Sequence, residues 1–287
     1  MAPKIAAVTM VYNEAHFLPR WIGHYAAQFG AENCTIIDHG SDDGCTDAPG
    51  RVNLLRIPRS PTDEAERASF VSTVCAALLT WYDWVIYTDV DEFLVADPAH
   101  YPTIRDLLAA SPHKVVTAVG FNVHHDDPRE PPIAPDRPVA GQRRWMMMVA
   151  AMCKPVAIAH PVQWAPGFHS SDAGVEFGRL FLFHLRNYDT QQSLKRLHKT
   201  RTMPWRDYGA DPNAIISDEE WRTRMRQVMN QIRRAGLSLD IDKPPLAGLL
   251  ERLRKESEQR NNEVYKLRLE LAVPELWELP PRFAGTF

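Results

Sequence analysis

Short apolar runs alternate with segments of helical periodicity over the first third of the chain. This alternation is typical of strand–helix–strand units, in which parallel strands are buried on both faces by the connecting helices. We therefore predict an α/β fold with a mostly parallel, Rossmann-like central sheet flanked by helices. The predicted strands are 4–12, 34–38, 52–57 and 84–88, and the predicted helices are 17–29 and 63–82.

Polar side chains follow three of these strands at the point where each strand ends. Asn13 and Glu14 come after the first, residues 38–47 are rich in Asp and Gly after the second, and residues 89–92 hold three acids after the fourth. The carboxyl ends of parallel strands meet at one edge of a sheet, and ligands bind beyond that edge. We therefore expect these residues to line one ligand site.

The stretch WVIYTDVDEFLV at 84–95 places Asp89, Asp91 and Glu92 directly after a buried strand. Carboxylates are hard oxygen ligands that suit Mg²⁺ or Mn²⁺, whereas three clustered acids without a cation would repel one another and resist burial. The alternative is a set of solvated loop acids, one of which begins the next helix. We predict a divalent metal here, with Glu92 either supporting the site or acting only as that helix-start acid.

A second acidic stretch, IIDHGSDDGCTD at 36–47, fails as a calcium loop of the EF-hand type. With Gly44 at the sixth position, the first ligand would be His39, which offers no oxygen. The stretch is either a turn that reverses the chain, or a loop in which Asp38 accepts a hydrogen bond from a bound base or ribose.

The second half of the chain is less regular. Five prolines interrupt residues 124–142, which predicts an ordered loop or lid. A charged stretch at 246–271 has leucines at its ends but breaks the heptad pattern in the middle, so a coiled coil is only an alternative there. Further strands are predicted at 114–123, 146–152 and 179–185, and further helices at 188–201 and 217–235.

Three motifs, at 11–25, 36–47 and 85–95, resemble in order and spacing the N-terminal half of GT-A glycosyltransferases, in particular a bacterial family-2-like subgroup with DvDEF after the strand. The segment LFLFHLRNYDTQQSLKRLHKTR at 180–201 resembles the His-containing strand and Lys-bearing helix of that subgroup, with Leu185 where an aromatic residue is usual. The resemblance covers about residues 1–200.

This resemblance implies the metal-dependent transfer of a sugar from a nucleotide-sugar, in particular a UDP-sugar, to a glycan or lipid-linked acceptor. A GT-A domain would span 1–205, with a nucleotide-binding half at 1–95 and an acceptor-side half at 96–205. Beyond the resemblance, the pattern of the chain predicts a helical extension at 206–287.

The resemblance also implies roles for particular residues. Asp91 and His184 would hold Mn²⁺ or Mg²⁺ together with Asp89, although His184 taken alone would be a core histidine in an apolar strand. Lys195 and Lys199, one helical turn apart, could cover the phosphates as point charges. The residues expected to bind the nucleotide are Asn13, Glu14, Asp38, Asp42, Arg67 and Asp89.

An inverting transfer needs a general base for the acceptor hydroxyl, and Asp172 lies in the stretch where inverting GT-A enzymes place one. Glu176, Asp126 and Asp127 are rivals that lie in no motif. A retaining reaction, which needs no such base, stays open. His169 is a second candidate for the metal and diphosphate site.

Two other functions remain as alternatives. A haloacid-dehalogenase-like phosphatase also places DxD after a strand, but usually the first strand, and with Thr or Val where Phe93 stands. A catalytically silent nucleotide-sugar-binding protein would keep the fold without turnover. Nucleic acid is not expected as a partner, because 33 basic and 36 acidic side chains give a net charge of −3.

The four cysteines are widely spaced, without a Cys-x-x-Cys pair, which favours a reducing compartment and no structural zinc. The N-terminal apolar run is too short for a signal sequence, and no run of about 18 apolar residues follows. We expect a cytoplasmic protein. Association with the inner face of the membrane and homo-oligomer formation through the C-terminal helices stay open.

Overall fold

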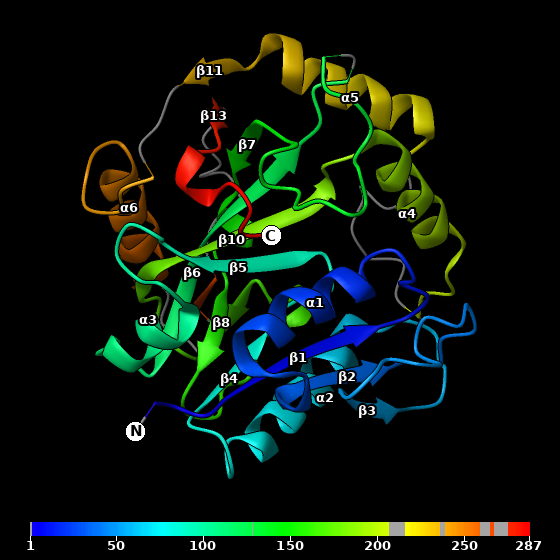
Figure 1. The fold of residues 1–287 in the computed structure, drawn as a ribbon, viewed down its shortest axis with the longest axis vertical. Helices are drawn as coiled ribbons and strands as arrows, with labels where there is room; N and C mark the ends of the chain where they lie inside the picture. The colour runs from blue at the N-terminus through cyan, green and yellow to red at the C-terminus, as the bar shows by residue number, and fades with distance from the viewer. Residues whose placement is uncertain (1, 128, 207–215, 236–238, 259–264, 267–274) are drawn as a thin grey trace.

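The computed structural model describes residues 2–127, 129–206, 216–235, 239–258, 265–266 and 275–287, which form a central sheet with helices on both faces (Figure 1). The elements of the first half are β1 (Ile5–Val11), α1 (Leu18–Phe29), β2 (Cys34–Asp38), β3 (Asn53–Arg56), α2 (Glu64–Leu78) and β4 (Trp84–Tyr87). Their strands are hydrogen-bonded in the order β3-β2-β1-β4, and each pairing is parallel. The predicted α/β class is confirmed, as are the strands and helices predicted in this half.

Successive residues of β1 face opposite helices, as the two-residue period of a strand requires. Ile5 and Ala7 belong to the apolar cluster that contains Trp21 of α1, whereas Ala6 and Val8 pack with residues of α2. Each of these four β1 residues is at most 1% exposed. Because both faces of β1 are covered, its carboxyl end is where the chain can present polar groups to a ligand.

Beyond β4 the sheet becomes mixed. The elements are β5 (Glu92–Ala96), α3 (Ile104–Ala110), β6 (Val115–His124), β7 (Trp145–Met148), β8 (Pro155–Ile158) and β10 (Phe177–Asn187). β8 runs antiparallel to β4 and β6, and β10 runs parallel to β6 and antiparallel to β5. Since β5 begins at Glu92, the alternative that Glu92 begins a helix is wrong.

The strand predicted at 146–152 stops early. β7 ends at Met148, and a 3₁₀ turn follows at Ala150–Met152. The backbone of this turn lies against Gly120 of β6, where an added Cβ would be 2.1 Å from the Met152 carbonyl oxygen. This close approach depends on a glycine 32 positions away in the chain, so the apolar periodicity of the segment does not reveal it.

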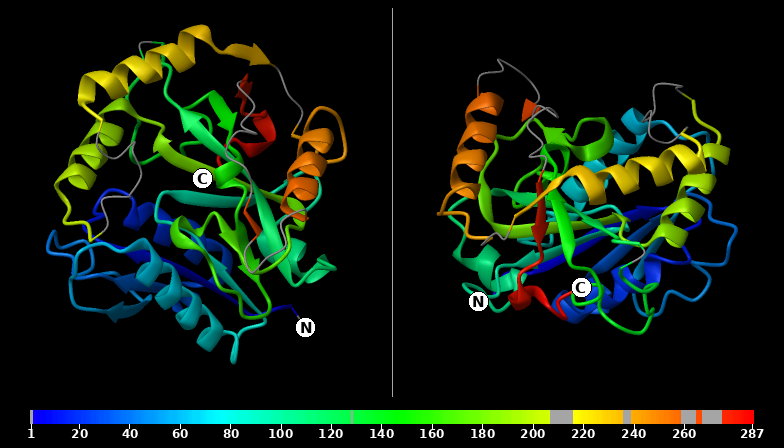
Figure 2. Two further views of the ribbon diagram at one scale, coloured as in Figure 1. Left: turned by 180° about the vertical axis from the view of Figure 1, so that it is seen from behind. Right: turned by 90° about the horizontal axis from the view of Figure 1, so that it is seen from above.

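The C-terminal part contributes strands as well as helices. α4 (Thr190–Thr202) and α5 (Asp218–Gln231) pack against each other and arch along one side of the sheet (Figures 1 and 2). β13 (Glu275–Glu278) pairs with β7, and β11 (Arg233–Ala235) pairs with β13. The expected helical extension at 206–287 is therefore joined to the main sheet by two strands.

α6 (Leu246–Glu258) covers the first half of the charged segment 246–271, and most of the rest of that segment lies outside the described residues. Three of its leucines are buried in the main apolar core, so they are not free to form the seam of a coiled coil. Further along, the structure describes β12 (Tyr265–Lys266), which pairs with β9 (Ser170–Ser171).

None of the helices in the described ranges is both long enough and apolar enough to cross a membrane. The four cysteines all lie in the described ranges, and each is a free thiol.

Two glycines give a matched test of the packing. Gly120→Ala should lower the free energy of unfolding by about 3 kcal/mol, because the new Cβ would overlap the Met152 backbone. Gly23→Ala should raise it by about 0.5–1 kcal/mol, because Gly23 is exposed within α1 and an added Cβ meets nothing within 4 Å. Urea unfolding of both variants checks the pair, and a neutral Gly120→Ala would contradict the close backbone contact.

Candidate active site

The predicted ligand edge of the sheet holds a polar pocket of about 180 Å³. Residues from the carboxyl ends of β1, β2 and β4 line it together with residues of α2 and α4, and Figure 1 shows β1, β2 and β10 all pointing toward α4. The polar and charged lining residues include Tyr12, Glu14, His39, Arg59, Arg67, Asp89, Arg196 and Lys199. The polar residues after these strands thus meet at one edge, as the sequence predicts.

Asn13 ties the first two strand ends together. Its side chain accepts hydrogen bonds from the backbone N–H groups of Asp42 and Asp43, at 2.9 and 3.3 Å, and donates to Asp42 Oδ1 at 2.6 Å. Asn13 has a φ of 51°, in the left-handed region that asparagine tolerates better than most residues. Asn13 and Asp42 therefore lie together, and they bind each other in this structure.

Asp38 shapes the loop that follows β2. One carboxylate oxygen accepts from the Ser41 N–H at 2.8 Å and the other from Thr46 Oγ1 at 2.6 Å, and the residue is 2% exposed. Burial alone would raise the pKa of Asp38, but the hydrogen bonds from Thr46 and Ser41 outweigh it and lower the pKa. Both oxygens are thus engaged by the chain.

Asp89, the first acid of the DxD, is held by cations. Its Oδ1 atom pairs with the Arg67 guanidinium and lies 3.3 Å from the Tyr87 hydroxyl, and its Oδ2 lies 3.4 Å from Lys154 Nζ. Burial would raise the pKa of Asp89, but Arg67 and Lys154 hold it far below its usual range. Asp89 and Arg67, both expected beside the nucleotide, therefore meet at the pocket.

Lys154 is a site residue that the sequence analysis missed. Its Nζ lies 2.5 Å from Glu92 Oε1, and Glu92 Oε2 accepts the Asp89 N–H at 3.1 Å. Lys154 and Glu92 are 3% and 1% exposed. Through this hydrogen bond Glu92 holds the backbone of Asp89 in place. A lysine inside the apolar run AAMCKPVAI is the sequence signal that could have identified this buried pair.

Asp91 and His184 form a separate pair. Asp91 Oδ2 lies 3.0 Å from His184 Nε2, and the residues are 2% and 8% exposed. His184 Nδ1 lies 2.8 Å from Asn122 Oδ1, an atom that can only accept, so Nδ1 carries the ring hydrogen and Nε2 turns a lone pair toward Asp91. Burial lowers the pKa of His184 to about 4, so the ring is neutral at pH 7.

A carboxylate oxygen and an imidazole lone pair that face each other are both electron-pair donors, so a cation bound between them is stabilised by both. Both are ligands that Mn²⁺ accepts, and ions of this class complete their shell with water and substrate phosphates. Asp91 and His184 thus fit the predicted metal once Arg196 of α4 leaves Asp91, whereas Asp89 is engaged by both Arg67 and Lys154. Within the described residues, no group of three or more His, Cys, Asp or Glu side chains is placed to hold a metal ion.

Positive side chains of α4 cover this pair. Arg196 forms an ion pair with Asp91 and lies 3.5 Å from Glu14 Oε1. Lys199 Nζ lies 2.5 Å from the same Glu14 oxygen and donates to two backbone carbonyls after β1. Lys199 therefore reaches the site as predicted, whereas Lys195 is exposed. Arg196 was missed because spacing along a helix does not tell which of two neighbouring basic residues turns inward.

Neither of the two predicted general bases lines the polar pocket. Asp172 Oδ1 accepts a hydrogen bond from the Gln163 N–H at 2.8 Å, which fixes its own loop. Glu176 directly precedes β10 and stands eight positions before His184. Phe177 pairs with Thr117 and His184 with Asn122, five positions further along β6, so at about 3.3 Å per residue roughly 17 Å separate Phe177 from His184. The structure does not bring Glu176 to the Asp91–His184 pair.

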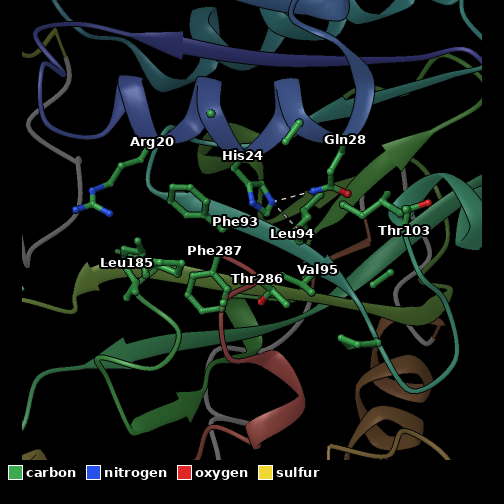
Figure 3. Close-up of a pocket in the computed structure, with 18 of the residues that line it drawn as sticks. Arg20, His24, Gln28, Phe93, Leu94, Val95, Thr103, Leu185, Thr286 and Phe287 are labelled. Atoms are coloured by element: carbon green, nitrogen blue, oxygen red, sulfur yellow. Dashed lines mark hydrogen bonds between the residues drawn. The ribbon is translucent and has the colours of Figure 1, made fainter. Parts of the chain in front are cut away.

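A larger cavity of about 490 Å³ lies between α1, β5 and the C-terminal residues, and it shares no lining residue with the polar pocket (Figure 3). Its walls include Phe93, Val95 and Phe287. His24 is half-buried beside it, with Nε2 2.9 Å from the Leu94 carbonyl oxygen. This cavity is mainly apolar, whereas the charged side chains that chemistry requires line the polar pocket.

Protonation of His24 yields a pH prediction. Burial lowers the pKa of His24 from 6.5 to about 4, so between these values the unfolded chain binds the proton and the folded protein does not. Stability therefore falls as the pH falls through this range. His24→Gln should remove up to about 3 kcal/mol of that loss, measured as the free energy of urea unfolding at pH 7 and pH 4. Parallel pH curves for wild type and variant would contradict it.

The buried ion pair yields a second prediction. Lys154→Met should lower the free energy of unfolding by about 3–5 kcal/mol, because it leaves the Glu92 carboxylate buried without its cation. The double variant with Glu92→Gln should regain part of that loss, since it removes both charges. Denaturant titrations of the single and double variants check this, and a double variant no more stable than Lys154→Met would show that the two side chains are not coupled.

Comparisons with known proteins give one sequence match. No protein-family model matches the chain. A glycosyltransferase family 92 protein of Ricinus communis is 34% identical over 94 residues, a match that covers 31% of this chain and 16% of the relative. The chain is therefore similar to a small part of that protein.

Solved structures give weak likenesses. Residues 1–349 of TarS from S. aureus match with a TM-score of 0.38 and 8% identity, over 83% of this chain and 77% of that one. The mannosyltransferase PcManGT from Pyrobaculum calidifontis, in complex with GDP-Man and Mn²⁺, matches with a TM-score of 0.28 and 16% identity, over 45% of this chain and 37% of that one. Scores of this size do not by themselves establish a common fold.

Proposed function

We propose that the protein is a metal-dependent glycosyltransferase that moves a sugar from a nucleotide-sugar, in particular a UDP-sugar, to a glycan or lipid-linked acceptor. The observation that carries the proposal is the Asp91–His184 pair, in which a buried carboxylate and a neutral imidazole lone pair face each other at 3.0 Å at the carboxyl edge of the sheet. The resemblance of the strand-end motifs and the matched segment of the Ricinus communis protein agree with it.

The pocket offers a place for the nucleotide. The Arg59 guanidinium lies 3.8 Å from the centre of the Tyr12 ring, so the end of β1 presents a flat cationic and aromatic surface. Such a surface suits a base, which stacks on aromatic and guanidinium planes. The ribose would then lie toward Asp89 and Arg67, which line the same pocket.

The diphosphate would lie where the cations gather. A Mn²⁺ or Mg²⁺ ion held by Asp91 and His184 would neutralise the nucleoside diphosphate as it leaves. Lys199 brings a second positive charge to this edge, and Arg196 can exchange Asp91 for a phosphate oxygen. Glu14 keeps both side chains of α4 at the strand end.

The phosphatase alternative has less support. A phosphatase of that type uses a carboxylate as its nucleophile. Here Asp89 is engaged by Arg67, the Tyr87 hydroxyl and Lys154, and its pKa is held far below its usual range, which makes its oxygens weak nucleophiles. A silent nucleotide-sugar binder differs from the proposed enzyme only in turnover.

Titration of UDP by calorimetry, with and without Mn²⁺, tests the proposed function. Wild type should bind UDP at least 10-fold more tightly with Mn²⁺, and Asp91→Asn should lose that difference because it removes the ligand charge. Asp136→Asn is a matched control, since Asp136 is exposed beside the apolar cavity. Absence of UDP binding by wild type, or an Asp91→Asn variant that keeps its metal dependence, would refute the assignment.

A further inference from the structure

A histidine on the connection between β8 and β9 directly follows a residue, Phe168, that contacts the charged site. His169 directly precedes β9, and the residue before it, Phe168, anchors the connection. The Phe168 ring lies 4.4 Å from the Tyr87 ring at the end of β4, and the Arg67 guanidinium lies 4.9 Å from it. The backbone is left-handed at Gly167 and Phe168, with φ of 78° and 61°, which a bulky residue such as Phe168 adopts only when its surroundings hold it.

Hydrogen bonding leaves one nitrogen of this ring free. His169 Nδ1 lies 2.6 Å from the Ala151 carbonyl oxygen, which can only accept, so Nδ1 carries the hydrogen and Nε2 keeps its lone pair. No residue in the described part of the chain donates to Nε2. A side chain at position 167 would crowd this nitrogen, since a Cβ on Gly167 would lie 3.1 Å from Nε2. The ring is therefore fixed as a hydrogen-bond acceptor.

Charged and polar groups of the site also influence this ring. Burial lowers the pKa of His169 to about 4, and the charges of Lys154, Asp89 and His184 also act on it. At neutral pH the ring is uncharged and can accept a proton. With a pKa of about 4, the ring is about as basic as a carboxylate. A carboxylate, that of Asp172, is the group predicted from the sequence as the general base.

The other candidate proton acceptors are less suitable. Asp172 is engaged by the Gln163 N–H, and Asp126 is ion-paired with two arginines. His124 has a buried Nε2 without a partner among the described residues, but it is 2% exposed, so an acceptor cannot reach it. His169 is partly exposed.

We propose that His169 is the general base of the transfer, an inference that rests on the proposed function. Nε2 takes the proton of the acceptor hydroxyl as that oxygen bonds to the anomeric carbon of the sugar. The bond from the anomeric carbon to the phosphate oxygen breaks at the same time, and its electron pair leaves with the nucleoside diphosphate. The Ala151 carbonyl, which already accepts from Nδ1, stabilises the imidazolium that forms.

The test uses water as the acceptor, because a base that activates a sugar hydroxyl also activates water. The full-length wild type, His169→Ala and His160→Ala are incubated with Mn²⁺ and a panel of UDP-glucose, UDP-galactose, UDP-N-acetylglucosamine and GDP-mannose, and nucleotide release is followed. His160 is an exposed histidine on the same connection and serves as the control. Metal-dependent UDP binding is measured on each variant, and free imidazole is added to His169→Ala.

His169→Ala should lower the release rate by about 10²–10⁴-fold while UDP binding stays within about 2-fold of wild type, and imidazole should restore part of the rate. Rates within about 3-fold of wild type would overturn the role of His169 and leave the proposed function standing. A loss of UDP binding as large as the loss of release rate would show that His169 has a structural role. A loss of release rate that imidazole does not restore would show the same. A wild type that neither binds UDP nor releases nucleotide would overturn both proposals, and an impaired His160→Ala would show that the loss is not specific to His169.

Discussion

A carboxylate buried at the end of a strand needs a positive partner, and the arrangement of the site depends on how Asp91 meets that need. Asp91 lies against the neutral His184 and is reached by Arg196 from α4. His184 is oriented by Asn122 on the neighbouring strand β6. The carboxyl edge of β4, the long strand β10 and the helix that follows it therefore converge on one side chain.

The two aspartates of the DxD motif, Asp89 and Asp91, form ion pairs with different side chains. Asp89 belongs to a closed network with Arg67, Lys154 and Glu92, in which each carboxylate has a cation. Asp91 has Arg196, a cation on a partly exposed side chain that can be exchanged. The fixed network holds the segment in place, and the exchangeable partner leaves Asp91 as the acid that can accept a ligand.

Local periodicity was sufficient to predict the first four strands, their helices and the shared ligand edge, because each is set by residues within one element. The contacts that complete the site were not predictable in this way. Lys154 meets Glu92 across 62 positions, and Arg196 meets Asp91 across 105. His184 was identified only by resemblance to a family, because the apolar residues around it predict a buried core strand and no functional site. The short strands β8 and β13 were missed because they are defined by partners on other strands and not by a pattern of their own.

The central claim is that Asp91 and His184 hold a divalent cation that comes with the nucleotide. Crystals grown with Mn²⁺ and UDP, measured at the manganese absorption edge, test it directly. The account predicts an anomalous peak between Asp91 and His184 Nε2, with the Arg196 guanidinium moved from Asp91 to a phosphate oxygen. Bound UDP with no manganese at this position, or manganese at another site while Arg196 still contacts Asp91, would contradict it.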